Sequence, residues 1–161
     1  MSAWTVSGEL SDTEADTVFR WIGQESYWAK GLPRQLFDRS LAHSLCFALR
    51  DGQGALRGFA RVVTDWATFE YLCDVYVCPS VRGQGGGKAL IGAVMDHPDL
   101  QNLRRWMLMT RDAHGLYAPF GFGPPADPGR VMVRVDPEVY ARLNAGADGD
   151  DSGQAWPRRR A

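Results

Sequence analysis

A glycine-rich segment, flanked by a strand-like run and a helix-like run, constrains this chain more than any other feature. Residues 75–90 read Val-Tyr-Val-Cys-Pro-Ser-Val-Arg-Gly-Gln-Gly-Gly-Gly-Lys-Ala-Leu, and four of the five residues at 83–87 are glycine. Glycine has no Cβ, so its backbone N–H groups can approach a ligand closely. The helix that follows adds free N–H donors and the positive end of its dipole. The segment therefore predicts a binding site for an anion such as a phosphate or pyrophosphate.

The length and composition predict a single globular domain. The chain has 161 residues, of which 45% are hydrophobic and 23% are charged, as is usual for such a domain. Its net charge of −1 gives no reason to expect a nucleic-acid or membrane partner. The first residues carry no signal-peptide pattern, so we expect a cytoplasmic location. A homodimer is the default expectation for the oligomeric state.

The three cysteines, Cys46, Cys73 and Cys78, lie in apolar, strand-like runs. Their spacing matches no metal-ligand pattern. We therefore expect reduced thiols that pack as small apolar side chains, and we expect no metal.

The first half of the chain predicts a short strand, two helices and an antiparallel meander. Ser11 and Glu14 form a capping-box pattern that opens the first helix, and Pro33 suits the first turn of the second. The Asp51-Gly52 pair is a strong hairpin-turn signal. The predicted strands of this half cover residues 4–7, 44–50, 56–64 and 69–77.

The second half predicts a strand-helix-strand unit around the glycine turn. The strand 69–77, a helix at 87–95 and a strand at 103–109 imply a parallel pair joined by a right-handed crossover. Asp112 can cap a short helix at 113–117. The last two predicted strands cover residues 120–122 and 131–135.

Two common nucleotide-binding loops do not fit the glycine turn. A Walker loop requires Gly, four residues and then Gly-Lys-Ser/Thr, but Arg82 replaces its first glycine and Ala89 its Ser/Thr. A Rossmann fingerprint, Gly-x-Gly-x-x-Gly, would place its third glycine on Lys88 or Leu90. The turn also follows a meander rather than the first strand of a doubly wound sheet.

The pattern that fits is Arg/Gln-x-x-Gly-x-Gly/Ala, which residues 82–87 satisfy as Arg-Gly-Gln-Gly-Gly-Gly. In these residues the sequence resembles the GCN5-related N-acetyltransferase (GNAT) family. A second motif supports the resemblance, because residues 113–122, Ala-His-Gly-Leu-Tyr-Ala-Pro-Phe-Gly-Phe, look like the late Ala-x-x-Leu-Tyr-x-x-x-Gly-Phe signature of that family. The order of elements matches from about residue 4 to 135.

The resemblance implies an α/β (α+β) fold. The expected architecture is a central, twisted, mixed and mostly antiparallel sheet of six to seven strands. About four helices flank it, and a splayed parallel pair holds CoA. We expect the GNAT domain to span residues 1–143 and residues 144–161 to form a disordered C-terminal tail.

The resemblance also implies acetyl-CoA as co-substrate. Its pyrophosphate would bind the N–H groups of residues 84–88, and its pantetheine arm would follow the strand 75–77. Thr110 stands where the family commonly has Asn, so its hydroxyl would replace an amide. The predicted cofactor-binding residues are Val75, Tyr76, Val77, Arg82, Gly83, Gln84, Gly85, Gly86, Gly87, Lys88, Thr110 and Ala113.

In the family an amine attacks the thioester directly, so the chemistry consists of positioning, oxyanion stabilisation and two proton transfers. Tyr117 occupies the position of the general acid; the alternative is a tyrosine that only packs or hydrogen-bonds the sulfur. Glu70 and Asp74 are the candidates for the base. Strand alternation places them on one face with Leu72 and Tyr76, unless a bulge near Asp74 alters it.

The acceptor site is expected between the first two helices, where Tyr27 and Trp28 either wall a pocket or seal the core. An acidic rim formed by Glu25, Glu70 and Asp74 would favour a cationic amine. The chain is thus predicted to acetylate a primary amine of a small molecule or a peptide. The alternatives are a non-catalytic acyl-CoA-binding or sensing module on the same fold, and an acyltransferase that uses a longer acyl chain.

Overall fold

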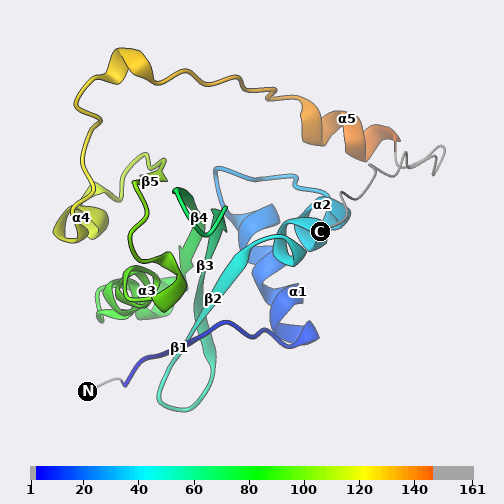
Figure 1. Ribbon diagram of the computed structural model, residues 1–161. Coiled ribbons are helices and arrows are strands. Elements are labelled where there is room, and N and C mark those ends of the chain that lie inside the picture. The colour runs from blue at the N-terminus through cyan, green and yellow to red at the C-terminus, as the bar shows by residue number, and fades with distance from the viewer. Residues whose placement is uncertain (1–2, 147–161) are drawn as a thin grey trace.

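Residues 3–146, the part of the chain that the structure describes, form a five-stranded mixed sheet with helices on both faces, as the computed structural model in Figure 1 shows. The strands stand in the order β1-β2-β3-β4-β5. Neighbours are antiparallel from β1 to β4, whereas β4 and β5 are parallel, which confirms the predicted meander and parallel pair. The strands are β1 (Thr5–Ser7), β2 (Leu45–Arg50), β3 (Leu56–Thr64), β4 (Phe69–Val77) and β5 (Arg105–Leu108).

The first helix begins where the capping box places it. The Ser11 N–H donates to Glu14 Oε2 over 2.9 Å, and the Glu14 N–H donates to Ser11 Oγ over 3.3 Å, so both orphan N–H groups are satisfied. Pro33 lies just before the second helix, as its N-cap. The α-helices are α1 (Asp12–Arg20), continued by a π-helical turn at Trp21–Glu25, α2 (Arg34–Ala42), α3 (Gly86–Met95), α4 (His114–Tyr117) and α5 (Val139–Gly146). Short 3₁₀ turns cover Pro79–Val81, Pro98–Leu100, Ala118–Phe120 and Pro128–Arg130.

Each face of the sheet has its own apolar core. Leu72 packs with Leu90 of α3 on one face, and Tyr76 packs with Val18 of α1 on the other. Figure 1 shows α1 and α3 on opposite sides of the strands. Burial of these side chains, rather than helix propensity, is the main source of stability for such short helices.

The two C-terminal strands expected from the sequence are not strands, and that prediction is wrong. The Ala118–Phe120 segment forms a 3₁₀ turn, and Gly121 follows with φ 90°, so residues 120–122 cannot run as an extended strand. Residues 131–135 pair with no strand in the part of the chain that the structure describes, although the backbone at Val131 is extended. Three prolines at 124, 125 and 128 precede them, and proline has no backbone N–H to donate to a strand ladder.

The predicted first residue of the C-terminal tail, residue 144, lies too early in the chain. Residues 144–146 belong to α5, in which Asn144 Nδ2 donates to the Gly31 carbonyl over 2.9 Å. The rest of the predicted tail, residues 147–161, lies outside the described residues. Within residues 3–146 no helix has the length and apolar character needed to cross a membrane.

Candidate active site

A cleft opens where the parallel strands part. The ladder between β4 and β5 covers only Phe69–Leu72 and Arg105–Leu108, whereas β4 continues to Val77. The expected splayed pair is therefore present. The cleft beyond the ladder has a volume of about 900 Å³. Its walls include residues 71–77 of β4, Arg82, Gly83 and Gly87 of the glycine turn, residues 109–113 after β5, and Tyr117.

A β-bulge at Asp74 sets which side chains of β4 face the cleft. Asp74 has φ 53°, and the register with β3 shifts between Phe59 and Arg61. The extra residue reverses the alternation. Glu70 therefore shares a face with Leu72, in the core beneath α3, whereas Tyr76 packs on the opposite face. The simple alternation that placed all four residues on one face is wrong beyond the bulge.

The glycine turn leads into α3 as predicted, and each glycine has a local structural reason. Gly83 and Gly85 have φ values of 77° and 85°, a region that costs other residues about 1–2 kcal/mol. Gly86 is packed, because a Cβ there would lie 3.0 Å from Leu49 Cδ2. A Cβ at Gly87 would lie 3.3 Å from Leu116 Cδ1, at the cleft wall. The first N–H groups of α3 have no helical carbonyl in a preceding turn to which they could donate a hydrogen bond.

The side chains around this turn are partly committed to the protein itself. Arg82 Nε donates to the Val77 carbonyl over 2.9 Å, and its guanidinium lies 5.8 Å from the centroid of the Tyr76 ring. The Gln84 carbonyl accepts a hydrogen bond from Trp4 Nε1 over 3.1 Å. Lys88 is exposed. These contacts fix the turn against the end of β4 and against the N-terminal segment.

Tyr117 ends α4 and reaches the cleft with only 7% of its surface exposed. Burial, with a smaller contribution from Tyr27, raises the pKa of Tyr117 to about 12. Its ring meets Phe122 edge-on at 6.1 Å. Thr110 Oγ1 accepts the Ala113 N–H over 3.0 Å, so this hydroxyl holds the turn that leads into α4.

Two predicted carboxylates line the cleft, and both have partners. Asp74 accepts from Arg61 Nε over 2.7 Å and from Trp28 Nε1 over 3.1 Å. Glu25 Oε2 accepts from the Tyr76 hydroxyl over 2.5 Å. Burial and this hydrogen bond raise the pKa of Tyr76 to about 12.

Glu70, the other candidate for the base, lies outside the cleft lining. Its side chain is fully buried, and neither carboxylate oxygen makes a hydrogen bond of ordinary geometry to the described residues. Burial raises the pKa of Glu70 to about 7, and the Met107 N–H is near enough to oppose part of that rise.

The acidic rim expected from the sequence is balanced by arginines. The described lining contains three acidic side chains and three arginines: Glu25, Asp74, Asp112, Arg61, Arg82 and Arg111. The charge of Asp74 is directly paired with Arg61. The lining therefore gives no net electrostatic preference for a cationic amine.

The aromatic pair predicted for the acceptor lies at the cleft. Tyr27 and Trp28 are 49% and 42% exposed and meet edge-on at 5.1 Å. The Tyr27 hydroxyl accepts the Arg111 N–H over 3.2 Å, and the Arg111 guanidinium lies 3.8 Å from the centre of its ring. These two aromatic residues therefore wall the cleft rather than seal the core.

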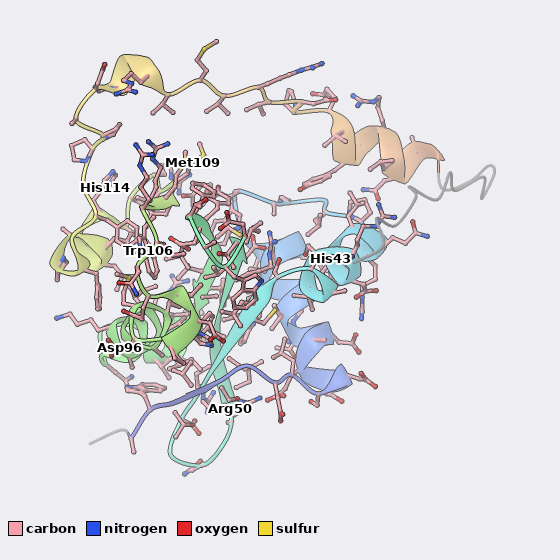
Figure 2. The ribbon with its side chains drawn as sticks, viewed as in Figure 1. His43, Arg50, Asp96, Trp106, Met109 and His114 are labelled. Carbon is pink, nitrogen blue, oxygen red and sulfur yellow. The ribbon has the colours of Figure 1, made fainter. Side chains whose placement is uncertain are left out.

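Among the lining residues that sequence reasoning did not name, two come from elements that were given no part in the site. Arg61 comes from β3 and Tyr140 from α5. Arg61 faces Asp74 only because of the bulge, and Tyr140 follows a segment with no motif. His114, labelled in Figure 2, begins α4 and is not among the lining residues.

The cysteines are free thiols, as expected. Burial raises the pKa of Cys46 to about 11 and that of Cys73 to about 12, so both are weak nucleophiles at neutral pH. Across residues 3–146 no group of three or more His, Cys, Asp or Glu side chains is arranged to hold a metal ion.

A mixed sheet whose parallel pair opens beside a helix N-terminus is the fold expected from the sequence, and comparisons with known proteins identify the family. The model of the Acetyltransferase (GNAT) family matches residues 11–122. The chain therefore belongs to the GNAT family of acetyltransferases.

Individual relatives agree with this assignment. A solved structure from Xanthomonas campestris pv. campestris, itself assigned as a GNAT acetyltransferase, is 48% identical, with a TM-score of 0.81 over 88% of this chain and 99% of that one. A protein of Gibberella zeae assigned as an acetyltransferase is 31% identical over 109 residues, 56% of this chain; the match spans 62% of that relative, less than two thirds of its length. AAC(6')-Iy, solved with the bisubstrate analogue CoA-S-monomethyl-acetylneamine, shares the fold at 19% identity, with a TM-score of 0.59 over 84% of this chain and 99% of that one.

Proposed function

We propose that this chain transfers the acetyl group of acetyl-CoA to a primary amine of a small molecule or peptide. The observation that carries the proposal is the convergence of the β4 end, the glycine turn and Tyr117 on one cleft. AAC(6')-Iy has been solved with a single molecule that joins CoA to an acetylated amine. That complex supports the idea that this fold can hold donor and acceptor side by side.

The donor half of the cleft suits CoA. The free N–H groups at the start of α3 would bind the pyrophosphate, and Gly83 and Gly87 let the backbone form the cleft wall. Beyond the ladder, residues 75–77 of β4 have no partner strand on the β5 side within the described residues. Apart from the Val77 carbonyl, which accepts from Arg82, their backbone groups on that side are available to the pantetheine amides. The proposed donor site thus consists of residues 75–77 and 82–88 with Thr110 and Ala113.

In the proposed reaction the amine nitrogen forms a bond to the acetyl carbon and the C–S bond breaks. Tyr117 donates a hydrogen bond, and then its proton, to the departing sulfur. With the pKa of Tyr117 near 12 and that of a thiol at about 8.5, complete transfer is uphill. The benefit therefore comes mainly from the hydrogen bond as charge develops on sulfur, and we expect the lower end of the range for general acids, about 100-fold.

Asp74 is the proposed acceptor of the amine proton, because it is the predicted base that lines the cleft. Arg61 and Trp28 hold its carboxylate in one position, which suits proton transfer through a short contact or a single water. Glu70 was the other candidate, and its full burial outside the lining separates it from a bound amine. We propose that the ionisation of Glu70 affects the stability of β4 rather than the reaction.

A screen of amine acceptors by release of CoA thiol tests the proposal. On the best acceptor, Tyr117→Phe should lower kcat about 100-fold and leave the thermal stabilisation by CoA intact. Tyr71→Phe is the matched control, because Tyr71 also lines the cleft and is given no role in the chemistry; its kcat should stay within about twofold of wild type.

Three results would count against the assignment. Equal kcat for Tyr117→Phe and wild type would remove Tyr117 from the chemistry. CoA binding without turnover of any amine would favour the non-catalytic acyl-CoA-binding module. Absence of any thermal shift with CoA would contradict the donor site itself.

A further inference from the structure

Trp4, the residue directly before β1, contacts the glycine turn from a distant part of the sequence. Its indole Nε1–H donates to the Gln84 carbonyl over 3.1 Å. The ring packs against the core beneath α3, and its Cε2 and Cζ2 atoms would lie 3.4 Å from a Cβ at Gly86. In Figure 1 the blue strand β1 runs beside α3 at the edge of the sheet. The indole is therefore held by packing and presents one hydrogen-bond donor to the turn.

This hydrogen bond orients the peptide unit between Gln84 and Gly85. In a planar trans peptide the C=O and the N–H point in opposite directions. Because the Gln84 carbonyl is turned toward Trp4, the Gly85 N–H points away from the indole. Within the described structure the N–H groups of residues 85–88 donate to no backbone carbonyl. The Gly85 N–H thus belongs to the group of donors that is free to bind an anion.

The backbone of the turn does not itself fix this orientation. Rotation of the peptide unit changes ψ of Gln84 and φ of Gly85, and glycine allows φ of either sign. The Gln84 side chain donates to the Ser80 carbonyl over 3.2 Å, which holds the amide but not the backbone. Among residues 3–146, Trp4 supplies the one hydrogen bond that the Gln84 carbonyl accepts. After such a rotation this carbonyl oxygen would face a bound pyrophosphate and repel it.

We propose that Trp4 is a positioning residue for the donor site, because its indole sets the Gln84–Gly85 peptide in the orientation that receives the CoA pyrophosphate before CoA binds. The inference rests on the proposed function, since it takes the glycine turn as the pyrophosphate site. Trp4 is not among the lining residues of the described cleft, so it acts through the turn rather than by touching CoA. A turn that is already oriented loses less conformational freedom on binding.

The test is calorimetric titration of the full chain with CoA, which needs no amine. Trp4→Phe keeps an aromatic ring against Gly86 and removes the donor. The dissociation constant for CoA should rise about three- to tenfold, the effect of one neutral hydrogen bond. With any accepted amine, KM for acetyl-CoA should rise in parallel and kcat should stay unchanged.

Trp106→Phe is the matched control. Trp106 of β5, labelled in Figure 2, packs against the same core and is not among the cleft-lining residues. The substitution removes the same atoms from that core as Trp4→Phe, so this variant should bind CoA as wild type does. Circular dichroism checks that both variants keep the fold.

Hydrogen exchange of the Trp4 indole proton tests the same contact in the wild-type chain, and it decides the matter if Trp4→Phe does not fold. Without CoA this proton should exchange more slowly than that of Trp66, which is 51% exposed. Addition of CoA should leave the Trp4 rate unchanged, because the hydrogen bond is already formed.

The outcomes separate this inference from the proposed function. Wild type that binds no CoA contradicts the donor site, and the role of Trp4 with it. An unchanged dissociation constant in Trp4→Phe, when wild type binds CoA, overturns the role of Trp4 alone. An equal rise in Trp106→Phe shows a general effect of core packing. Fast exchange of the Trp4 indole proton that slows only with CoA means that the ligand, rather than Trp4, orients the turn.

Discussion

Replacing the buried carboxyl of Glu70 with an amide should change how the stability of this protein depends on pH. In the folded chain the pKa of Glu70 is raised from 4.5 to about 7, so the unfolded chain releases this proton first as the pH rises. Between pH 4.5 and about pH 7 the folded state binds more protons than the unfolded state. The free energy of unfolding therefore falls with increasing pH over this interval. At ~1.4 kcal/mol per pKa unit the full loss is about 3 kcal/mol.

The assay is urea unfolding of wild type and Glu70→Gln at a series of pH values from 4.5 to 8. The amide does not titrate, so any constant cost of burying it cancels when the difference between the two proteins is followed across pH. We expect wild type to lose about 3 kcal/mol relative to the variant over this range, with no further change above pH 8. Glu138→Gln, at an exposed position, should run parallel to wild type. Parallel curves for Glu70→Gln would refute the reasoning and show that Glu70 is ionised, or solvated, in the folded protein.

Three further predictions concern the site. Gly85→Ala should lower the free energy of unfolding by about 1–2 kcal/mol in urea titrations, because φ is 85° at this position; an unchanged midpoint would contradict the strain. The value of kcat should not decline on the alkaline side up to pH 10, because the pKa of Tyr117 is raised to about 12; a decline near pH 8 in a stopped assay would contradict its role as proton donor. Trp28→Phe removes the hydrogen bond to Asp74 and should raise KM for the amine several-fold, with CoA affinity unchanged in calorimetry; a weakened CoA affinity would place Trp28 in the donor site.

Much of the fold could be predicted because its signals are local. The capping box at Ser11, the Asp51-Gly52 turn and the glycine turn each specify backbone geometry within a few residues, and the structure contains all three elements. The sequence analysis attributed all four glycines of the turn to anion binding. Gly86, however, is needed for packing against Leu49 whether or not a ligand binds.

The remaining features depend on contacts that are distant in sequence. The bulge at Asp74 arises from the pairing of β4 with β3, which no pattern within β4 specifies, and it decides that Asp74 reaches the cleft while Glu70 does not. Tyr140 reaches the cleft because α5 packs across the loop at Gly31. The predicted strand at 131–135 is absent although the backbone at Val131 is extended, because a strand also needs a neighbouring strand, which the segment itself does not specify.

A crystal structure with acetyl-CoA bound tests the central claim most directly. The account predicts the pyrophosphate on the N–H groups of residues 84–88, the acetyl carbonyl beside Val75 and Tyr76, and the thioester sulfur within hydrogen-bond reach of the Tyr117 hydroxyl, with the amine side open toward Asp74. Acetyl-CoA bound away from the cleft between β4 and β5, or a sulfur atom out of reach of Tyr117 even through one water, would contradict it.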